Sequence, residues 1–262
     1  MLLSLGLVSA LALAATLPLA WKWQLGLRRV AIAATVTALV TASAGRAVGL
    51  GTAVSVPVAW AATMALLVAA LAYRFYRDPE RTAPAADDVV VSPADGEVVY
   101  VRHVRAGRVA VATKHGRDYP LEELTKTPLA AADAVVIGVG MSFLDVHVNR
   151  APIAGRVTLQ RHFPGLFGSL RNPEMVLRNE RATTVIERGA LHVAVVQIAS
   201  RLVRQIAAFV GEGDDVALGQ RIGVIRLGSQ VDLVLAWPGG VDVDVKPGDR
   251  VRAGISVLAT LR

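Results

Sequence analysis

The sequence predicts a mainly β domain that follows an N-terminal region of transmembrane helices. Three observations support this fold class. Long charge-free apolar runs occur only within the first 73 residues. From about residue 82 onward, short β-like runs alternate with Gly, Pro and Asp, which is typical of a barrel or a sandwich. Parts of this second region also repeat one another. We therefore expect two domains, over residues 1–81 and 82–262.

The N-terminal region is expected to anchor the chain in a membrane. Residues 1–21, 30–45 and 47–73 carry no charge. About 20 apolar residues span a bilayer as a helix, so the first and third runs are long enough and the shorter second run is marginal. Two or three helices are therefore expected, with a re-entrant or interfacial hairpin over residues 30–73 as the alternative. The first run lacks a basic n-region and a clear cleavage site, so we interpret it as a retained anchor.

Basic residues indicate how these helices are oriented. Three basic residues lie between the first and second runs and three more follow the third, whereas only Arg46 separates the second from the third. Because positive residues favour the cytoplasmic side, the 22–29 loop and everything after Arg74 are expected in the cytoplasm. The predicted location is the cell (inner) membrane, with the β domain on its cytoplasmic face.

Composition excludes several classes of function. The 262 residues include no cysteine, which excludes disulfides, Cys-ligated zinc and thiol nucleophiles. The net charge of +7 suits anionic lipid, acidic substrates or nucleic acid. Aromatic residues make up only 5% of the chain, which argues against base stacking, and we expect no nucleic-acid partner. The five histidines form no pair with metal-ligand spacing, so no metal site is expected.

Two internal repeats indicate the architecture of the β domain. "GDDVALG" begins at Gly213 and "GDRVRAG" begins at Gly248, 35 residues later. "PADGEV" at Pro93 similarly resembles "PIAGRV" at Pro152. Each repeat predicts a turn, a strand and a glycine turn, as in the barrel-sandwich hybrids of biotinyl and lipoyl carrier domains. No lysine occupies a carrier-type hairpin turn, so this resemblance concerns shape and not function.

Three residues are candidates for chemistry, and each also has a structural interpretation. Asp95 lies in "SPADG", where a turn alone would explain it. His147 lies in "LDVHVNR", where strand alternation would put Asp145, His147 and Asn149 on one face. Such a histidine could be a general base or a satisfied, partly buried residue. Gly228-Ser229 interrupts a strand, which by itself indicates a β-bulge, and no G-x-S-x-G elbow supports a hydrolase serine.

The segment "QRHFPGLFGSLRNPEMVLRNER", residues 160–181, combines apolar side chains with arginines. This combination suits a loop folded back on the core or a lipid interface. Guanidinium groups pair well with phosphate, so Arg161, Arg171 and Arg178 are candidates for binding a phosphate head group. The segment also contains a second Gly-Ser pair at Gly168-Ser169, which serves as a control for the first.

Taken together, these motifs resemble the phosphatidylserine decarboxylase family in its short prokaryotic form. The residues that carry the resemblance are "YRFYRDPERTAP", "VVSPADGEVV", "MSFLDVHVNRAPIAGRV", "RNERAT", "VVQIASRLVRQI" and "GVIRLGSQVD". They cover nearly the whole chain after Arg74, in the family's order. The resemblance implies an autocatalytic proenzyme that converts phosphatidylserine to phosphatidylethanolamine and CO2 in phospholipid biosynthesis.

The resemblance also implies a role for each candidate residue. The chain would cut itself between Gly228 and Ser229 into a β chain, residues 1–228, and an α chain, residues 229–262, which stay together as a heterodimer. Ser229 would become a covalent pyruvoyl group, the only cofactor expected, which forms a Schiff base with the substrate. His147 would be the base and Asp95 its orienter. A phospholipid membrane is the expected partner, and homo-oligomerisation is left open.

The sequence departs from the longer family members at one position and leaves two alternatives open. Those members have two histidines three residues apart, whereas here the second position holds Arg150. His147 would then serve both self-cleavage and protonation, or another group would take one role. The first alternative is the same reaction on an archaeal ether lipid, archaetidylserine. The second is a non-catalytic, membrane-tethered barrel-sandwich adaptor, which would stay uncut.

Overall fold

The computed structural model describes residues 2–22, 25–105, 107–109, 119–129, 133–170, 172–201, 206–226 and 229–262. The chain divides into two compact units, Met1–Arg77 and Asp78–Arg262. This division lies four residues before the boundary expected from composition. The reason is that Asp78, Glu80 and Arg81 form ion pairs with side chains of the second unit. The predicted fold class, mainly β with N-terminal apolar helices, is confirmed.

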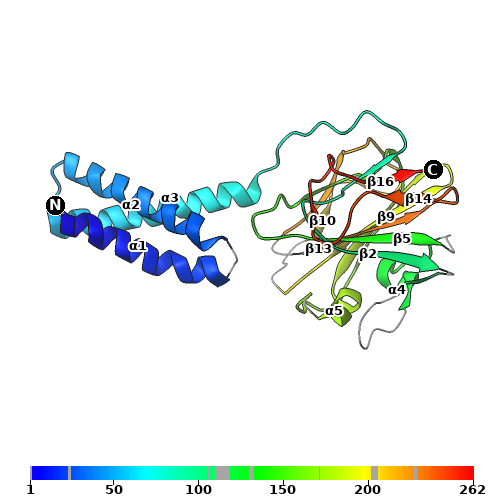
Figure 1. Cartoon of the computed structure of the whole chain (residues 1–262), viewed down its shortest axis with the longest axis horizontal. Coiled ribbons are helices and arrows are strands. Elements are labelled where there is room, and N and C mark those ends of the chain that lie inside the picture. The colour runs from blue at the N-terminus through cyan, green and yellow to red at the C-terminus, as the bar shows by residue number, and fades with distance from the viewer. Residues whose placement is uncertain are drawn as a thin grey trace. The chain divides into compact units, whose positions relative to one another are not determined.

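The first unit contains three helices that pack on one another, α1 (Leu2–Lys22), α2 (Leu27–Ala47) and α3 (Thr52–Tyr76) (Figure 1). By length and composition, α2 and α3 are each long and apolar enough to cross a membrane, and α1 carries a shorter apolar stretch, Leu5–Trp21. The buried contacts are made largely by alanines, which let helix backbones approach closely. Thr41 and Thr63 share a 2.8 Å hydrogen bond between α2 and α3.

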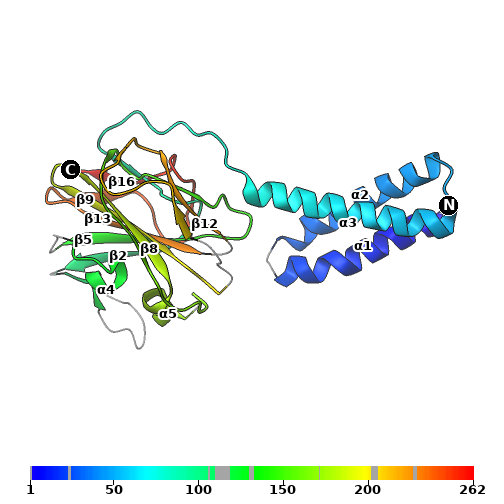
Figure 2. The ribbon, with the colours of Figure 1, turned by 180° about the vertical axis from the view of Figure 1, so that it is seen from behind.

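In the part of the chain that the structure describes, the second unit has three antiparallel sheets (Figure 2). The largest has the order β11-β7-β8-β9-β13-β5-β2-β3-β4, with β15 paired to β2, and the two small sheets have the orders β1-β16-β14 and β10-β12-β6. Two short helices, α4 (Leu121–Thr125) and α5 (Pro173–Arg178), lie in connections. The strands are β1 (Val89–Val91), β2 (Gly96–Arg105), β3 (Arg108–Val109), β4 (Tyr119–Pro120), β5 (Ala134–Gly140), β6 (Val148–Arg150), β7 (Gly155–Phe163), β8 (Arg181–Arg188), β9 (Leu191–Ile198), β10 (Ile206–Ala208), β11 (Asp215–Val216), β12 (Arg221–Ile225), β13 (Gln230–Ala236), β14 (Val241–Val243), β15 (Arg250–Val251) and β16 (Val257–Leu261).

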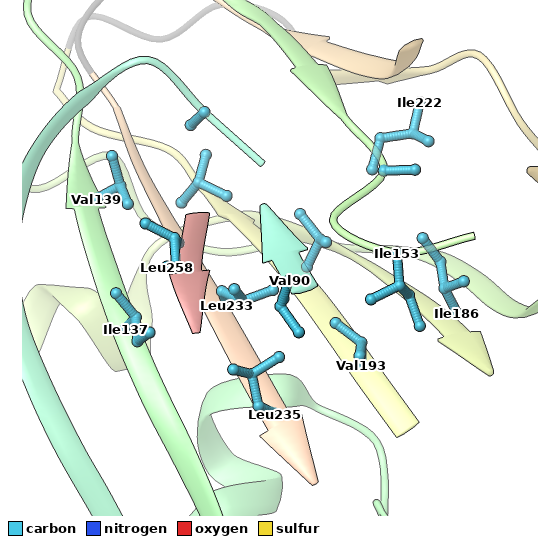
Figure 3. Close-up of a cluster of buried hydrophobic side chains, with 14 of the residues drawn as sticks. Val90, Ile137, Val139, Ile153, Ile186, Val193, Ile222, Leu233, Leu235 and Leu258 are labelled. Atoms are coloured by element: carbon cyan, nitrogen blue, oxygen red, sulfur yellow. The ribbon is translucent and has the colours of Figure 1, made fainter. Parts of the chain in front are cut away.

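The large sheet has a hydrophobic core on each face, and β13 contributes to both. Because side chains alternate along a strand, Leu233 and Leu235 join the larger core, whereas Val234 and Ala236 join the second. Figure 3 shows Leu233 and Leu235 beside Val90 and Leu258 in the larger core. Every residue of β13 is buried, and the strand pairs with β5 on one side and β9 on the other. The residue that precedes β13 therefore lies at the end of a buried strand that is paired on both sides.

The internal repeats are confirmed in the backbone. Gly213 and Gly248 have φ values of 95° and 96°, and Gly219 and Gly254 have 75° and 72°, which favour glycine at all four positions. The strands that follow the first glycine of each pair are equivalent: β11 pairs with the start of β7, and β15 pairs with the start of β2. The second glycines approach each other, since a Cβ on Gly254 would lie 3.3 Å from the Gly219 Cα.

Candidate active site

Three motifs that are far apart in the sequence meet at β6. The carbonyl of Pro93, in the "SPADG" turn, accepts hydrogen bonds from the Arg150 N–H at 3.0 Å and from Asn149 Nδ2 at 3.3 Å. On the other side, β12 pairs with β6, and the N–H of Ile225 donates to the carbonyl of His147 at 3.1 Å. The chain then leads from Ile225 to Ser229 within four residues. Gly228, the other half of the expected cleavage site, lies outside the described residues.

Ser229 lies immediately before β13 and is buried, with 3% of its surface exposed. Its carbonyl accepts from the N–H of Met141 at 2.9 Å, and its Oγ lies 3.3 Å from the Met141 sulfur. A thioether is a weak acceptor, so this contact holds the hydroxyl only weakly. Gln230, the next residue, is paired with both Gly140 and Ile198. The backbone after Ser229 is therefore fixed on both sides. Ser169, in the second Gly-Ser pair, is exposed.

His147 is buried, with 2% of its surface exposed, just before β6 begins at Val148. The expected alternation of three polar residues on one strand face is therefore wrong for Asp145. That residue lies in a bend before the strand, where its carboxylate accepts from the Ser142 N–H and from Arg250. Asn149 lies on β6 as expected and accepts a 2.8 Å hydrogen bond from Gln197.

Asp95 is buried and held by two partners. Arg81 forms a two-point ion pair with it, with Nη1 2.5 Å from Oδ1 and Nη2 2.9 Å from Oδ2. The N–H of Ala253 also donates to Oδ1 at 2.8 Å. The turn interpretation of Asp95 explains the backbone but not this pairing, because a turn aspartate normally bonds its own neighbouring backbone.

Arg150, at the position of the second family histidine, is buried between the two internal repeats. Its Nη1 donates to the carbonyl of Gly219 at 2.9 Å, and its Nη2 donates to the carbonyl of Pro79 at 2.9 Å and to Asp78 at 3.3 Å. Burial, followed by the nearby charge of Arg221, lowers its pKa. A guanidinium in a protein nevertheless stays protonated and has no acceptor atom, so Arg150 cannot replace a histidine as a base.

Two of the candidate phosphate-binding arginines, Arg161 and Arg178, lie on separate elements. Arg161 is exposed on β7, opposite Thr183 of β8. Arg178 is exposed at the end of α5, where its carbonyl accepts from the Leu166 N–H. Arg171 lies outside the described residues. Exposed guanidiniums on this segment are available to an anionic head group, which leaves their predicted role open to test.

Sequence reasoning missed a buried polar cluster on the face of the large sheet that carries Asp232. The hydroxyl of Tyr100 donates to Asp232 at 2.5 Å, and Gln230 Nε2 contacts both of them, at 2.8 and 2.7 Å. Burial raises the pKa of Asp232 to about 6, against the lowering effect of those hydrogen bonds. Tyr100 reaches Asp232 across Gly138, where a Cβ would lie 2.6 Å from the Tyr100 ring. The available signal was the presence of two polar residues, Gln230 and Asp232, that alternate with apolar ones in β13.

Comparison with known proteins is consistent with these motifs. The family model for phosphatidylserine decarboxylase matches residues 68–259. A phosphatidylserine decarboxylase proenzyme of Geobacter sulfurreducens is 36% identical over 207 residues, which cover 78% of this chain and 84% of the relative. One of Erythrobacter litoralis is 40% identical over 187 residues, 71% of each chain.

An archaeal protein is similarly close. A protein of Methanocaldococcus jannaschii with the provisional name archaetidylserine decarboxylase proenzyme is 39% identical over 190 residues, which cover 72% of this chain and 88% of the relative. The family match includes the end of α3, both internal repeats and all three motifs that meet at β6. This chain therefore belongs to the phosphatidylserine decarboxylase family.

Proposed function

We propose that the protein is a phosphatidylserine decarboxylase proenzyme, which cuts itself before Ser229 and then converts phosphatidylserine to phosphatidylethanolamine and CO2. The observation that carries this proposal is the convergence of the "SPADG", "DVHVNR" and "GVIRLGSQVD" segments at β6, which contacts Pro93 on one side and Val224 and Ile225 on the other. Each segment supplies one of the three groups that nucleophilic self-cleavage requires: Ser229, His147 and Asp95.

The proposed self-cleavage proceeds through an ester and then a dehydroalanine residue. His147 takes the proton of the Ser229 hydroxyl, whose oxygen attacks the carbonyl carbon of Gly228 and converts the peptide bond to an ester. Removal of the Ser229 α-proton then expels the Gly228 carboxylate and leaves dehydroalanine. Addition of water and release of ammonia convert this residue to a pyruvoyl group at the new end of the α chain. Asp95 is the proposed orienter of this base.

The surroundings of Ser229 fit a pyruvoyl group. A small, uncharged group replaces the serine, so a buried position beside Met141 can hold it without an unpaired charge. Both ladders of β13 keep its backbone in place after the cut. When formed, the group supplies a carbonyl that accepts the electrons left by the departing CO2. His147 is the residue of this site best suited to move protons near neutral pH.

The lipid substrate accounts for the apolar helices and the exposed arginines. We propose that α2 and α3 anchor the chain in the cell membrane, with the second unit on the cytoplasmic face, as the distribution of basic residues predicts. Arg161, Arg171 and Arg178 are proposed to attract the head-group phosphate. Ester-linked phosphatidylserine is the proposed substrate, and the ether lipid archaetidylserine is the second candidate because of the archaeal relative.

The test is whether the chain cuts itself at one defined bond. Wild-type protein should run as two chains, and mass spectrometry should show a 34-residue chain, residues 229–262, that begins with a blocked pyruvoyl residue. Ser229→Ala should remain one chain of 27.6 kDa, whereas the control Ser169→Ala should be processed normally. An uncut wild-type chain would refute the proposal. Vesicles that contain either phosphatidylserine or archaetidylserine then identify the substrate by CO2 release.

A further inference from the structure

Residues 78–81, which follow the last apolar helix after Arg77, are tied to the candidate active site. Asp78 accepts from Arg150 and from Arg221, and Glu80 accepts from Arg221. Arg150 also donates to the carbonyl of Pro79. We call residues 78–81 the strap. Through these contacts the strap touches β6 and β12, the two strands that lead to His147 and Ser229.

Arg81 is the strap residue that reaches furthest into the site. Its side chain is only 6% exposed and that of Asp95 is 10% exposed. Besides its two contacts with Asp95, its Nη1 donates to the carbonyl of Ala253 at 2.8 Å. Since the Ala253 N–H also binds Asp95, the guanidinium, the carboxylate and the backbone of Ala253 form a closed ring. A two-point guanidinium–carboxylate pair fixes orientation as well as distance.

The hydrogen bonds of this ring occupy most of the acceptor positions of the Asp95 carboxylate. An ionised carboxylate has about four acceptor positions. Arg81 occupies two of them and the Ala253 N–H occupies a third. Among the contacts of the described residues, about one position therefore remains for a proton-bearing group such as the proposed base. The ring gives that position a fixed direction, which an aspartate on a free turn would lack.

We propose that Arg81 is a positioning residue for self-cleavage, which acts by holding the Asp95 carboxylate. This inference rests on the proposed function, and it adds that the junction between the apolar helices and the β domain is part of the machinery. The chain is then competent to cut itself only when the strap is seated. Processing is thereby linked to correct placement of the segment that leaves the membrane.

The experiment follows processing of the full chain after a pulse of synthesis, by the appearance of residues 229–262. The variants are Arg81→Ala, Asp95→Asn and the double variant. The matched control is Arg262→Ala, which removes an exposed arginine–aspartate pair, with Asp242, that touches neither the strap nor Asp95. We expect Arg81→Ala to slow processing roughly ten- to a hundredfold and Arg262→Ala to change it less than about twofold. Millimolar guanidinium should partly restore Arg81→Ala.

The double variant separates positioning from folding. If Arg81 acts through Asp95, then Arg81→Ala causes no further slowing in the Asp95→Asn background. Effects that multiply in the double variant, unchanged processing of Arg81→Ala, or loss of the folded β domain in Arg81→Ala/Ser229→Ala would each overturn the proposal. Guanidinium rescue of Arg81→Ala but not of the double variant would support it. An uncut wild-type chain would instead refute the proposed function.

Discussion

Replacement of Asp232 by asparagine should stabilise the protein at neutral pH. Asp232 is fully buried, and its carboxylate accepts hydrogen bonds from Tyr100 and Gln230. Desolvation raises its pKa from 3.8 to about 6. Asparagine has nearly the same shape and can keep a hydrogen bond to each neighbour, but it never ionises. The substitution therefore removes the cost of burying a charge.

The sign and size of the effect follow from proton binding. Below about pH 4 the carboxyl is neutral in both the folded and unfolded chain, and its titration contributes nothing. Between pH 4 and 6 the unfolded chain loses the proton while the folded chain keeps it, so stability falls as the pH rises. Above pH 6 the carboxyl is ionised in both states, and the full loss of stability remains. A difference of about two pKa units corresponds to roughly 3 kcal/mol, or about 6–12 °C in Tm for a domain of this size.

The assay is thermal unfolding of the full chain in detergent, in the Ser229→Ala background, between pH 4 and 8. The Tm of Asp232→Asn should exceed that of the parent above pH 7, and the two should converge near pH 4. A control is Asp242→Asn, since the hydrogen bond from Arg262 lowers the pKa of Asp242 and gives the opposite slope with pH. A Tm difference for Asp232→Asn that is independent of pH would refute the reasoning.

Three further substitutions test packing and buried polar contacts. Gly138→Ala would force a Cβ within 2.6 Å of the Tyr100 ring. We expect this clash to lower the free energy of unfolding, measured with urea, by about 1–3 kcal/mol. An unchanged urea midpoint would contradict the crossing of Tyr100 over Gly138. Arg181→Met should lower the free energy of unfolding by about 3 kcal/mol or more, because three buried carbonyls lose their hydrogen-bond donor. Protection of nearby amides from hydrogen exchange should fall as well. Thr63→Ala should weaken helix packing by about 0.6 kcal/mol, because its hydrogen bond to Thr41 is lost. The measurement is unfolding of the helices in mixed micelles. Thr16→Ala is the control, since the Thr16 hydroxyl bonds to the Ala12 carbonyl of its own helix.

Much of the fold could be predicted because its signals are local. Charge-free runs indicate the apolar helices, and the repeated G-D-x-V-x-x-G pattern indicates a duplicated turn whose glycines do share the same positive φ. Motif order alone was enough to identify the family. Local patterns could not predict that β6 begins only at Val148, after Asp145, because the turn at residues 143–144 has no marked turn residues.

The buried polar pairings could not be predicted, because they depend on the register between distant strands. A register shift between Val98 and Tyr100 in β2 places Tyr100 opposite Gly138, on the face that carries Asp232. No residue type marks this shift, and without it Tyr100 would point into the other core. The pairing of Arg81 with Asp95 likewise needs the path of the strap, which carries no periodic pattern.

The position of β13 has a consequence for the lifetime of the protein. Residues 229–262 contribute β13 between β5 and β9, β15 beside β2, and β16 beside β1. A chain cut before Ser229 is thus two interwoven fragments, and neither can leave without opening the sheets. Once unfolded, the fragments must meet again by diffusion, so refolding becomes second order in protein concentration. If the proposed cut occurs, the severed bond would not be remade, and each molecule would be activated once.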